Sequence, residues 1–320
     1  MSRNSPFDYA VLIVPRGRSL NDNRNRLIDA AILIAGTVIA WALAVLPRSA
    51  ILIDGSYLPF GVDAFYHAER ILDVALNGSG VQQFDPRMHV PEGSWVPWPW
   101  AFDRLLATFV QAGTWFDADL LPMQVLVYVP VAWIPVNIAL LIGIFKAVDL
   151  RPEFRALGVL GFALLPLTQR LHGIGAIDHH FMELTFVLLV ALSLLRWLSR
   201  PSSMVLAGAV GASLGVAQAF HHGLFVLQLP VLGTLFILWL RGSLPVAPAM
   251  RALSASLLAT TALMILPSEP LWDGQFGLAT FSWFHLYIAF STAAVLVFMS
   301  IKTCSRRSLV GISAIGAVLA

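Results

Sequence analysis

Long uninterrupted runs of apolar residues are the feature that most restricts what this chain can fold into. Blocks of about 18–25 apolar residues predict membrane-spanning helices, which satisfy all their backbone hydrogen bonds internally. Charged residues make up only 12% of the 320 residues, against about 25% in a typical soluble protein. A chain so poor in charge cannot cover a soluble surface, and the short alternating segments of a β-barrel do not occur. We therefore predict an all-α, polytopic transmembrane helical bundle.

The apolar blocks predict eight spans, at residues 27–46, 120–145, 156–170, 182–198, 203–220, 223–240, 252–267 and 280–301. Residues 1–26 form a polar, Arg-rich tail, and the first block is too long for a cleavable signal. A ninth block starts near Leu309 and stops at Ala320, which is too short to cross a bilayer. We therefore expect a transmembrane domain over 27–320 that is cut off inside a ninth span of a longer protein. The single cysteine, Cys304, excludes an intrachain disulfide.

Basic residues orient the predicted bundle. They cluster in the tail and after the second, fourth, sixth and eighth spans, which are the alternate loops that the positive-inside rule assigns to the cytoplasm. The N-terminus is then cytoplasmic, and residues 47–119 form a long first extracytoplasmic loop. This loop contains a helix-like stretch, Ala64 to Leu76, and a Pro/Trp cluster from Pro91 to Trp100.

Most acidic residues and all eight histidines fall in the predicted outer segments. Solvation of loops gives histidine no reason to prefer one side. This bias indicates that the extracytoplasmic face carries the chemistry.

Two outer segments contain candidate catalytic residues. The first is Gly61-Val-Asp-Ala-Phe-Tyr-His67, in which Asp63 is either a helix N-cap or a functional carboxylate. The second is Gly175-Ala-Ile-Asp-His-His-Phe-Met-Glu183, in which Asp178 is again a candidate cap. An Asp-x-His pair such as Asp178 and His180 can also chelate a divalent metal, and mixed oxygen and nitrogen ligands suit Mn²⁺. Asp63 becomes a third ligand if the first loop folds over this segment.

Other polar residues are candidates for substrate binding. They are His179 and Glu183 in the second motif, Trp95 in the first loop, and His221 and His222 at a later outer hairpin. The two hairpin histidines are either the polar tip of a tight turn or donors to a lipid headgroup phosphate. Trp95 is either an interfacial anchor or part of a site. Nucleotide-binding and nucleophile-elbow motifs do not occur, and the basic residues give no sign of nucleic-acid binding.

Taken together, the motifs resemble the catalytic subunit family of oligosaccharyltransferases. The segment from Asp63 to His67 resembles the first-loop motif of that family, and the stretch from Pro91 to Asp103 resembles its Pro/Trp region before the second span. The Asp-His-His sequence at 178–180 is most similar to the archaeal branch. The resemblance extends over nearly the whole chain, in the same order and topology.

The resemblance implies a GT-C fold and transfer of a glycan from a polyprenyl-(pyro)phosphate carrier to Asn in Asn-x-Ser/Thr, with inversion at the anomeric carbon. It implies that Asp63, Asp178 and His180 bind Mn²⁺ or Mg²⁺, and that Asp63 and Asp178 act in catalysis. It also implies an integral protein of the plasma (inner) membrane with an extracytoplasmic active face. The family has a further outer-loop Glu and a soluble C-terminal domain that this sequence lacks, so we expect these 320 residues to be inactive alone.

Two alternatives remain open at this point. One is another GT-C glycosyltransferase that uses a polyprenyl-phosphate sugar and modifies lipid, polysaccharide or Ser/Thr. The other is a non-enzymatic polyprenyl-lipid transporter or membrane subunit, in which the polar clusters are only helix caps and loop ends.

Overall fold

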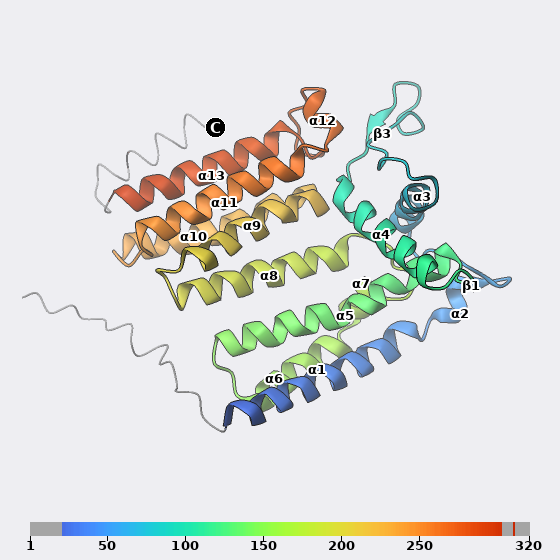
Figure 1. Cartoon of the computed structure of the whole chain (residues 1–320), viewed down its shortest axis with the longest axis horizontal. Helices are drawn as coiled ribbons and strands as arrows, with labels where there is room; N and C mark the ends of the chain where they lie inside the picture. The colour runs from blue at the N-terminus through green and yellow to red at the C-terminus, as the bar shows by residue number, and fades with distance from the viewer. Residues whose placement is uncertain (1–20, 303–309, 311–320) are drawn as a thin grey trace, which may run out of the picture.

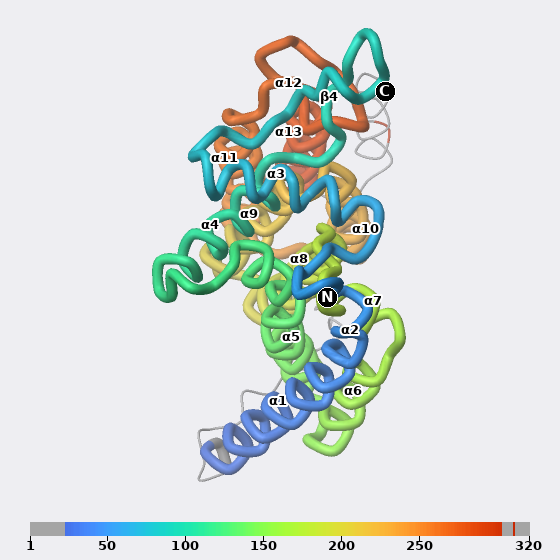
Figure 2. The backbone as a smooth tube through the Cα atoms, turned by 90° about the vertical axis from the view of Figure 1, so that its right-hand side faces the viewer, coloured from blue at the N-terminus to red at the C-terminus, as the bar shows by residue number. Residues whose placement is uncertain are grey.

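The computed structural model describes residues 21–302 and residue 310, and its long helices lie side by side in one bundle (Figure 1). These helices are α1 (Asn21–Val45), α5 (Pro122–Ala147), α6 (Pro152–Leu164), α8 (His180–Leu198), α9 (Met204–Phe220), α10 (Gln228–Leu240), α11 (Ala247–Ile265) and α13 (Trp283–Ile301). Turned by 90°, the bundle has α1 and α6 at one edge and α11 and α13 toward the other (Figure 2). The expected all-α polytopic bundle is confirmed.

Six helical segments in the described part of the chain are long and apolar enough to cross a membrane: Asn23–Val45, Pro122–Ala147, His180–Leu198, His222–Leu240, Ala247–Ile265 and Trp283–Ile301. The fourth of these combines a 3₁₀ turn, η2 (His222–Leu227), with α10. The segment expected to span at 203–220 is the shorter apolar helix α9. Six of the eight predicted spans are therefore long and apolar enough to cross a membrane.

The span expected at 156–170 is not a continuous helix. α6 ends at Leu164, and a separate short helix, α7 (Pro166–His172), follows it. Leu165 between them is extended, with φ −67° and ψ 126°. Pro166 disfavours the helical conformation of the residue before it and has no N–H to donate, so the apolar run breaks at this point.

The first loop is largely structured. It contains α2 (Arg48–Ile51), the hairpin of β1 (Leu52–Ile53) and β2 (Ser56–Tyr57), α3 (Val62–Asn77), the hairpin of β3 (Phe84–Asp85) and β4 (Ser94–Trp95), and α4 (Trp100–Phe116). α3 confirms the helix expected over 64–76. These elements gather at one end of the bundle, where α12 (Glu269–Trp272) also lies (Figure 1).

Side-chain hydrogen bonds hold the first loop together and tie it to the bundle. The buried carboxylate of Asp85 accepts hydrogen bonds from Tyr66 at 2.8 Å and from the backbone N–H of Arg87 at 2.7 Å. The Arg87 guanidinium lowers the pKa of Asp85 to about 2, despite the opposing effect of burial. Trp100 donates its indole N–H to the carbonyl of Met264 in α11 at 3.1 Å, which links α4 to a distant helix.

Close approach of α9 to α11 depends on two glycines. A Cβ atom on Gly211 would collide with the backbone of α11 at Leu253, and one on Gly215 would collide with Thr260. Small residues four positions apart let two helices pack backbone against backbone. In membranes, the van der Waals contacts of such interfaces commonly stabilise helix association.

A buried polar network joins α5, α7 and α8. The amide nitrogen of Asn137 donates to His172 Nε2 at 2.9 Å, and the Thr185 hydroxyl donates to Asn137 Oδ1 at 2.7 Å. The Trp133 indole N–H donates to the Thr185 oxygen at 2.9 Å. Asn137 and His172 are fully buried, and lipid offers no hydrogen-bond partners. These hydrogen bonds therefore satisfy polar groups that would otherwise have no partner.

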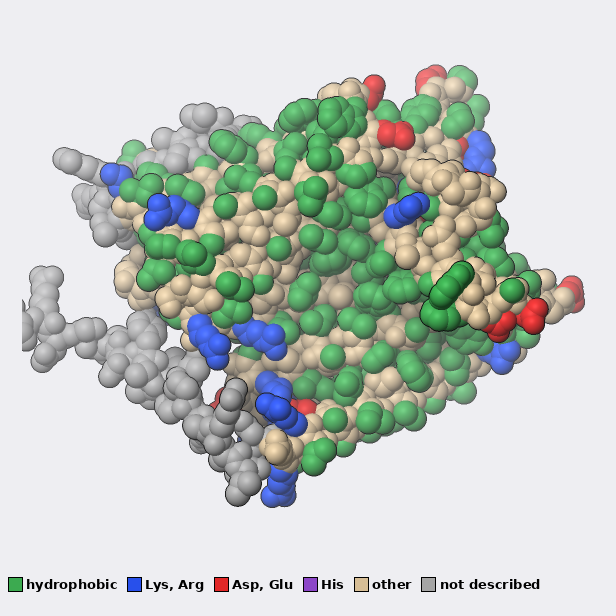
Figure 3. Space-filling view, viewed as in Figure 1, with side chains coloured by type: hydrophobic (Ala, Val, Ile, Leu, Met, Phe, Trp, Pro, Cys, Tyr) green, Lys and Arg blue, Asp and Glu red, His purple; other side chains and the backbone are tan. Residues whose placement is uncertain are grey.

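Charges separate between the two ends of the bundle (Figure 3). Lys and Arg gather at the end where α5 passes into α6, and Asp and Glu gather at the end that carries the first loop. At the basic end, Asp29 of α1 forms ion pairs with Lys146 at 2.8 Å and Arg155 at 3.2 Å. The basic loops therefore share one end, as expected, and the assignment of that end to the cytoplasm stays a prediction.

Three expectations fall on residues outside the described part of the chain. They concern most of the tail at 1–26, the thiol of Cys304 and the ninth apolar block from Leu309.

We expect Asn137→Ala to lower the free energy of unfolding by about 1–3 kcal/mol, because it leaves buried partners on α7 and α8 without hydrogen bonds. The measurement is denaturant-induced unfolding of the detergent-purified protein. Val136→Ala is the control, because Val136 directly precedes Asn137 in α5 and its side chain is 38% exposed. This variant should lower the free energy of unfolding less. Equal losses in the two variants would contradict a stabilising role for the network.

Candidate functional site

The site is assembled by a backbone junction between the first loop and the segment that connects α7 to α8. The N–H of Phe60 donates to the carbonyl of Gly175 at 2.7 Å, and the N–H of Gly175 donates to the carbonyl of Val127 in α5 at 2.9 Å. The N–H of Ile174 donates to the carbonyl of Ala44, near the end of α1, at 3.1 Å. The first loop thus folds against the segment that carries Asp178, so both acidic motifs lie at the same end of the bundle.

Gly175 is required at this junction for two reasons. Its φ of +80° is a conformation that residues with a Cβ rarely adopt. A Cβ atom would also lie 3.2 Å from the carbonyl oxygen of Leu58 and 3.3 Å from the nitrogen of Phe60. A larger residue would therefore strain the turn and push the first loop away.

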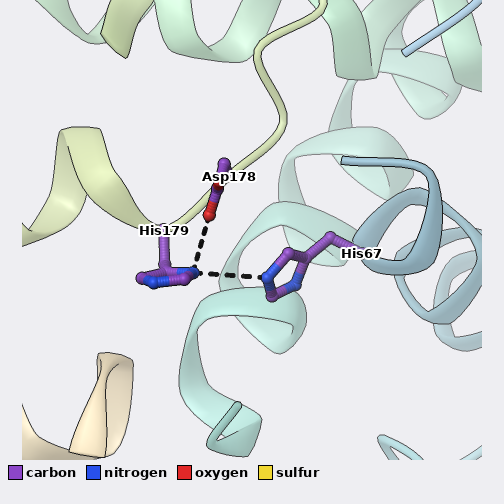
Figure 4. Close-up of side chains that lie close together, drawn as sticks. All are labelled: His67, Asp178 and His179. Carbon is purple, nitrogen blue, oxygen red and sulfur yellow. Dashed lines mark hydrogen bonds and ion pairs between the residues drawn. The ribbon is translucent and has the colours of Figure 1, made fainter. Parts of the chain in front are cut away.

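His67, Asp178 and His179 form a compact cluster (Figure 4). His179 Nδ1 lies 2.7 Å from Asp178 Oδ1 and 3.4 Å from His67 Nε2. His67 projects from α3, whereas the other two residues precede α8. One ligand atom from each residue lies within 4.8 Å of the others, a spacing at which one metal ion can bind all three.

A second group of possible ligands continues from the first, at the start of α8. It consists of His179, His180 and Glu183. His180 Nδ1 lies 2.6 Å from Glu183 Oε2, and His180 Nε2 lies 3.5 Å from Asp178 Oδ2. His179 and Asp178 therefore connect the buried cluster to more exposed donors.

Neither predicted helix cap is found. Gly61 is the N-cap of α3, and Asp63 lies in the first turn. His179 is the N-cap of α8, and its side chain makes no capping hydrogen bond. The Asp178 Oδ1 atom is buried and has no hydrogen bond of acceptable geometry. The capping interpretation is therefore wrong for both aspartates.

Asp63 belongs to neither group of convergent donors, although its carboxylate interacts electrostatically with His180. The structure thus brings together two of the three ligands expected from the motifs, Asp178 and His180. Asp63 lies close enough to add its charge to the site.

The other predicted substrate-binding residues separate into two regions. His221 Nδ1 lies 2.5 Å from Glu183 Oε1, and its ring stacks on His179 with centroids 4.3 Å apart. His222 follows, and its carbonyl accepts a hydrogen bond from His285 Nε2 at 3.1 Å. Trp95 lies instead in the β3–β4 hairpin, where its ring packs edge-on against Phe84.

The sequence motifs did not predict one buried ion-pair network of the site. Asp103 of α4 binds His67 Nδ1 through Oδ1 at 2.6 Å and Arg70 through Oδ2 at 2.6 Å. All three side chains are almost fully buried. The spacing of His67 and Arg70, three residues apart on one helix face, was a readable signal. Nothing local to Asp103 indicated that α4 would bring it to α3.

The electrostatics favour the metal-binding forms of Asp178 and His179. Burial raises the pKa of Asp178, but the contact with His179 and the neighbouring imidazoles outweigh burial and hold the pKa below its ordinary value. Burial lowers the pKa of His179. At neutral pH Asp178 is therefore ionised and His179 neutral, as metal ligands must be.

No family model and no curated protein sequence matches the chain. Solved structures of the oligosaccharyltransferase from Archaeoglobus fulgidus do match its fold. The complex of that protein, AglB, with an inhibitory peptide and a dolichol-phosphate gives a TM-score of 0.72 at 19% identity, over 91% of this chain and 36% of that one. This chain has the fold of an oligosaccharyltransferase.

Two further structures of the same archaeal protein agree. The complex with zinc and sulfate gives a TM-score of 0.71 at 18% identity, over 90% of this chain and 37% of that one. The form tethered to an acceptor peptide with the NVT sequon gives a TM-score of 0.71 at 16% identity, over 91% of this chain and 37% of that one. The chain spans about a third of the length of these proteins and matches their N-terminal part. The resemblance inferred from the motifs is confirmed for the fold.

We expect Gly175→Ala to destabilise the protein and to weaken divalent-cation binding at least tenfold, because it displaces the junction that brings the two motifs together. Thermal unfolding and calorimetric titration with Mn²⁺ measure the two effects. Gly78→Ala is a matched control: Gly78 also has a positive φ, of +66°, but a Cβ there meets nothing within 4 Å. That variant should lose about 1 kcal/mol of stability and keep its cation affinity. Unchanged cation affinity in Gly175→Ala would show that the junction does not organise the site.

Proposed function

We propose that this protein is a metal-dependent glycosyltransferase that transfers a glycan from a polyprenyl-(pyro)phosphate carrier to Asn in Asn-x-Ser/Thr segments of acceptor proteins. The observation that carries this proposal is the cluster of Asp178, His179, His180 and Glu183, which meets the first loop at one end of a bundle with the oligosaccharyltransferase fold. The buried Oδ1 atom of Asp178 lies 2.7 Å from His179 Nδ1 but has no hydrogen bond of acceptable geometry, which supports a cation-binding role.

The residues proposed to hold the ion are Asp63, Asp178 and His180, with Mn²⁺ or Mg²⁺ as the cation. When bound, the ion would supply Lewis-acid and electrostatic stabilisation of charge on the leaving phosphate. Asp63, at the start of α3, would also accept a hydrogen bond from the acceptor amide and so orient it.

His179, His221 and His222 are proposed to bind the phosphate groups of the donor, since their rings adjoin one another beside Glu183. Glu183 would hold His180 and His221 in position through its two oxygens. Trp95 would contribute an apolar ring for substrate binding from the β3–β4 hairpin of the first loop, where it is supported on Phe84.

The classes of donor and acceptor are supported by the structural relatives. The archaeal protein is known in complex with a dolichol-phosphate and tethered to an acceptor peptide that contains an NVT sequon. It is also known in complex with zinc. These ligands belong to that protein, and their transfer to this chain is part of the proposal.

We also propose that the protein resides in the plasma (inner) membrane with the site on the extracytoplasmic face. The concentration of basic residues at the opposite end of the bundle supports this orientation (Figure 3).

We expect Asp178→Asn and Asp63→Asn each to reduce glycan transfer at least about 100-fold, because each removes a charge from the proposed metal centre. The assay uses membranes containing the full-length protein, a polyprenyl-linked glycan and a fluorescent Asn-x-Thr peptide, with transfer followed by gel shift. Chelation by EDTA should abolish transfer, and Mn²⁺ should restore it.

Asp73→Asn is the matched control, because Asp73 lies on α3 and bonds only local partners, Asn77 and Ser79. It should retain transfer, and all variants should insert into membranes normally. Wild-type transfer by Asp178→Asn would contradict the proposal. Metal-dependent transfer to lipid, polysaccharide or Ser/Thr but not to the Asn peptide would favour the other type of GT-C glycosyltransferase.

A further inference from the structure

The geometry points to a second, inner divalent-cation site formed by His67 Nε2, Asp178 Oδ1 and His179 Nδ1. It lies toward the buried His67, whereas the metal centre proposed above lies toward Asp63 and the more exposed His180. The inference rests on the proposed function only in that the two sites share Asp178.

The three ligand atoms of the inner site already converge. His179 Nδ1 is 3.4 Å from His67 Nε2 and 2.7 Å from Asp178 Oδ1, and all three atoms lie within 4.8 Å of one another. Ligands about 2.0–2.1 Å from a tetrahedral cation are separated from each other by about 3.4 Å. The nitrogen pair therefore already has the spacing of a bound pair. At 2.7 Å from the ionised Asp178 Oδ1, His179 Nδ1 carries a proton. Binding of a cation would therefore require this proton to move to His179 Nε2, which lies 3.9 Å from Glu183 Oε1, and the Asp178 carboxylate to move back slightly.

The hydrogen bond to Asp103 determines which ring nitrogen of His67 is the donor. An ionised carboxylate can only accept a hydrogen bond, so Asp103 Oδ1, at 2.6 Å, requires the proton to be on His67 Nδ1. In the neutral imidazole Nε2 then carries the lone pair, and it faces His179 and Asp178 (Figure 4). Histidine ligands of metals commonly donate their other ring N–H to a carboxylate in this way.

Arg70 secures this arrangement. Its guanidinium lies 2.6 Å from Asp103 Oδ2, so the carboxylate that orients His67 is itself neutralised within the protein interior. Because Asp103 is paired with Arg70, it leaves Asp178 with only the imidazoles of His179 and His180 as its ion-pair contacts in the described part of the chain. A partly buried carboxylate is costly to desolvate, and a cation between Asp178 and the two imidazoles of the inner site would offset that cost.

The two oxygens of Asp178 face different donors. Oδ1 faces His179 at 2.7 Å, and Oδ2 lies 3.5 Å from His180 Nε2. The donors of the inner site come from α3 and from the segment before α8, whereas His180 belongs to α8 itself and turns toward Glu183. One carboxylate can thus serve two cations, as in two-metal sites with ions about 3.5–4 Å apart.

The chemistry of the donors defines the preferred ion. Two imidazole nitrogens and one carboxylate oxygen favour a borderline transition metal such as Zn²⁺ or Co²⁺ over Mg²⁺, which prefers oxygen ligands. The inner site should therefore select a different ion from the oxygen-rich outer site.

Titration of the metal-free full-length protein with Co²⁺ tests the inference, because coordinated Co²⁺ has visible absorption bands that report its ligands. We expect His67→Gln to weaken the affinity for Co²⁺ at least about 100-fold and to change the bands. Asp103→Asn should weaken the affinity about 10–100-fold, as is usual for loss of a partner that orients a histidine ligand. His89→Gln is the control, since His89 lies in the first loop and belongs to neither group of convergent donors, and it should bind Co²⁺ like the wild type.

The outer site is tested separately by Asp63→Asn, which should keep Co²⁺ bound at the inner site while losing Mn²⁺-dependent transfer. Unchanged Co²⁺ binding by His67→Gln would overturn the inner site and leave the proposed function intact. A measurement on the wild type guards against misfolding of the variants: pulsed EPR of the protein with one equivalent of Cu²⁺ should detect two coordinated imidazoles. Detection of one imidazole would overturn the inference.

Discussion

The hydrogen bond from Phe60 to Gly175 is the contact on which the organisation of the site depends. It joins a loop that follows α1 to a segment that precedes α8, and α5 and α1 hold that segment through Val127 and Ala44. Only glycine permits the required φ and the close approach of the two backbones. Without this junction, α3 and its His67 would have no fixed position relative to Asp178, and the convergent donors would be separate motifs.

Buried polar groups secure the surroundings of the site. Asn137, His172 and Thr185 join α5, α7 and α8. Asp103 joins α4 to α3 through His67 and Arg70. A polar group inside an apolar bundle is tolerated only when its partners are present, so such networks specify one arrangement of the helices. Here both networks fix elements that carry donor side chains, which links the rigidity of the bundle to the geometry of the candidate metal centre.

Six of the eight histidines converge on one region. His67, His179, His221, His222 and His285 form a series of adjacent rings, and His180 contacts His179. They come from α3, the start of α8, the α9–α10 turn and α13, so no stretch of sequence reveals the series. His172 does not belong to it and supports the helices instead, which shows that a bias of histidines toward one side is not sufficient to assign function.

The sequence by itself determined the helical membrane-spanning character of the chain, the helix after Asp63 and the two acidic motifs, because these depend on local composition and spacing. Pro166 in the sequence also indicates the helix break between α6 and α7, although the continuous apolar run around it favoured a single span. The tertiary structure alone decided that Asp103 orients His67, that His179 stacks on His221 and that neither aspartate is a helix cap. The two contacts join residues 36 and 42 positions apart in the chain. They follow from how whole helices pack and how the first loop closes over them, which no local pattern specifies.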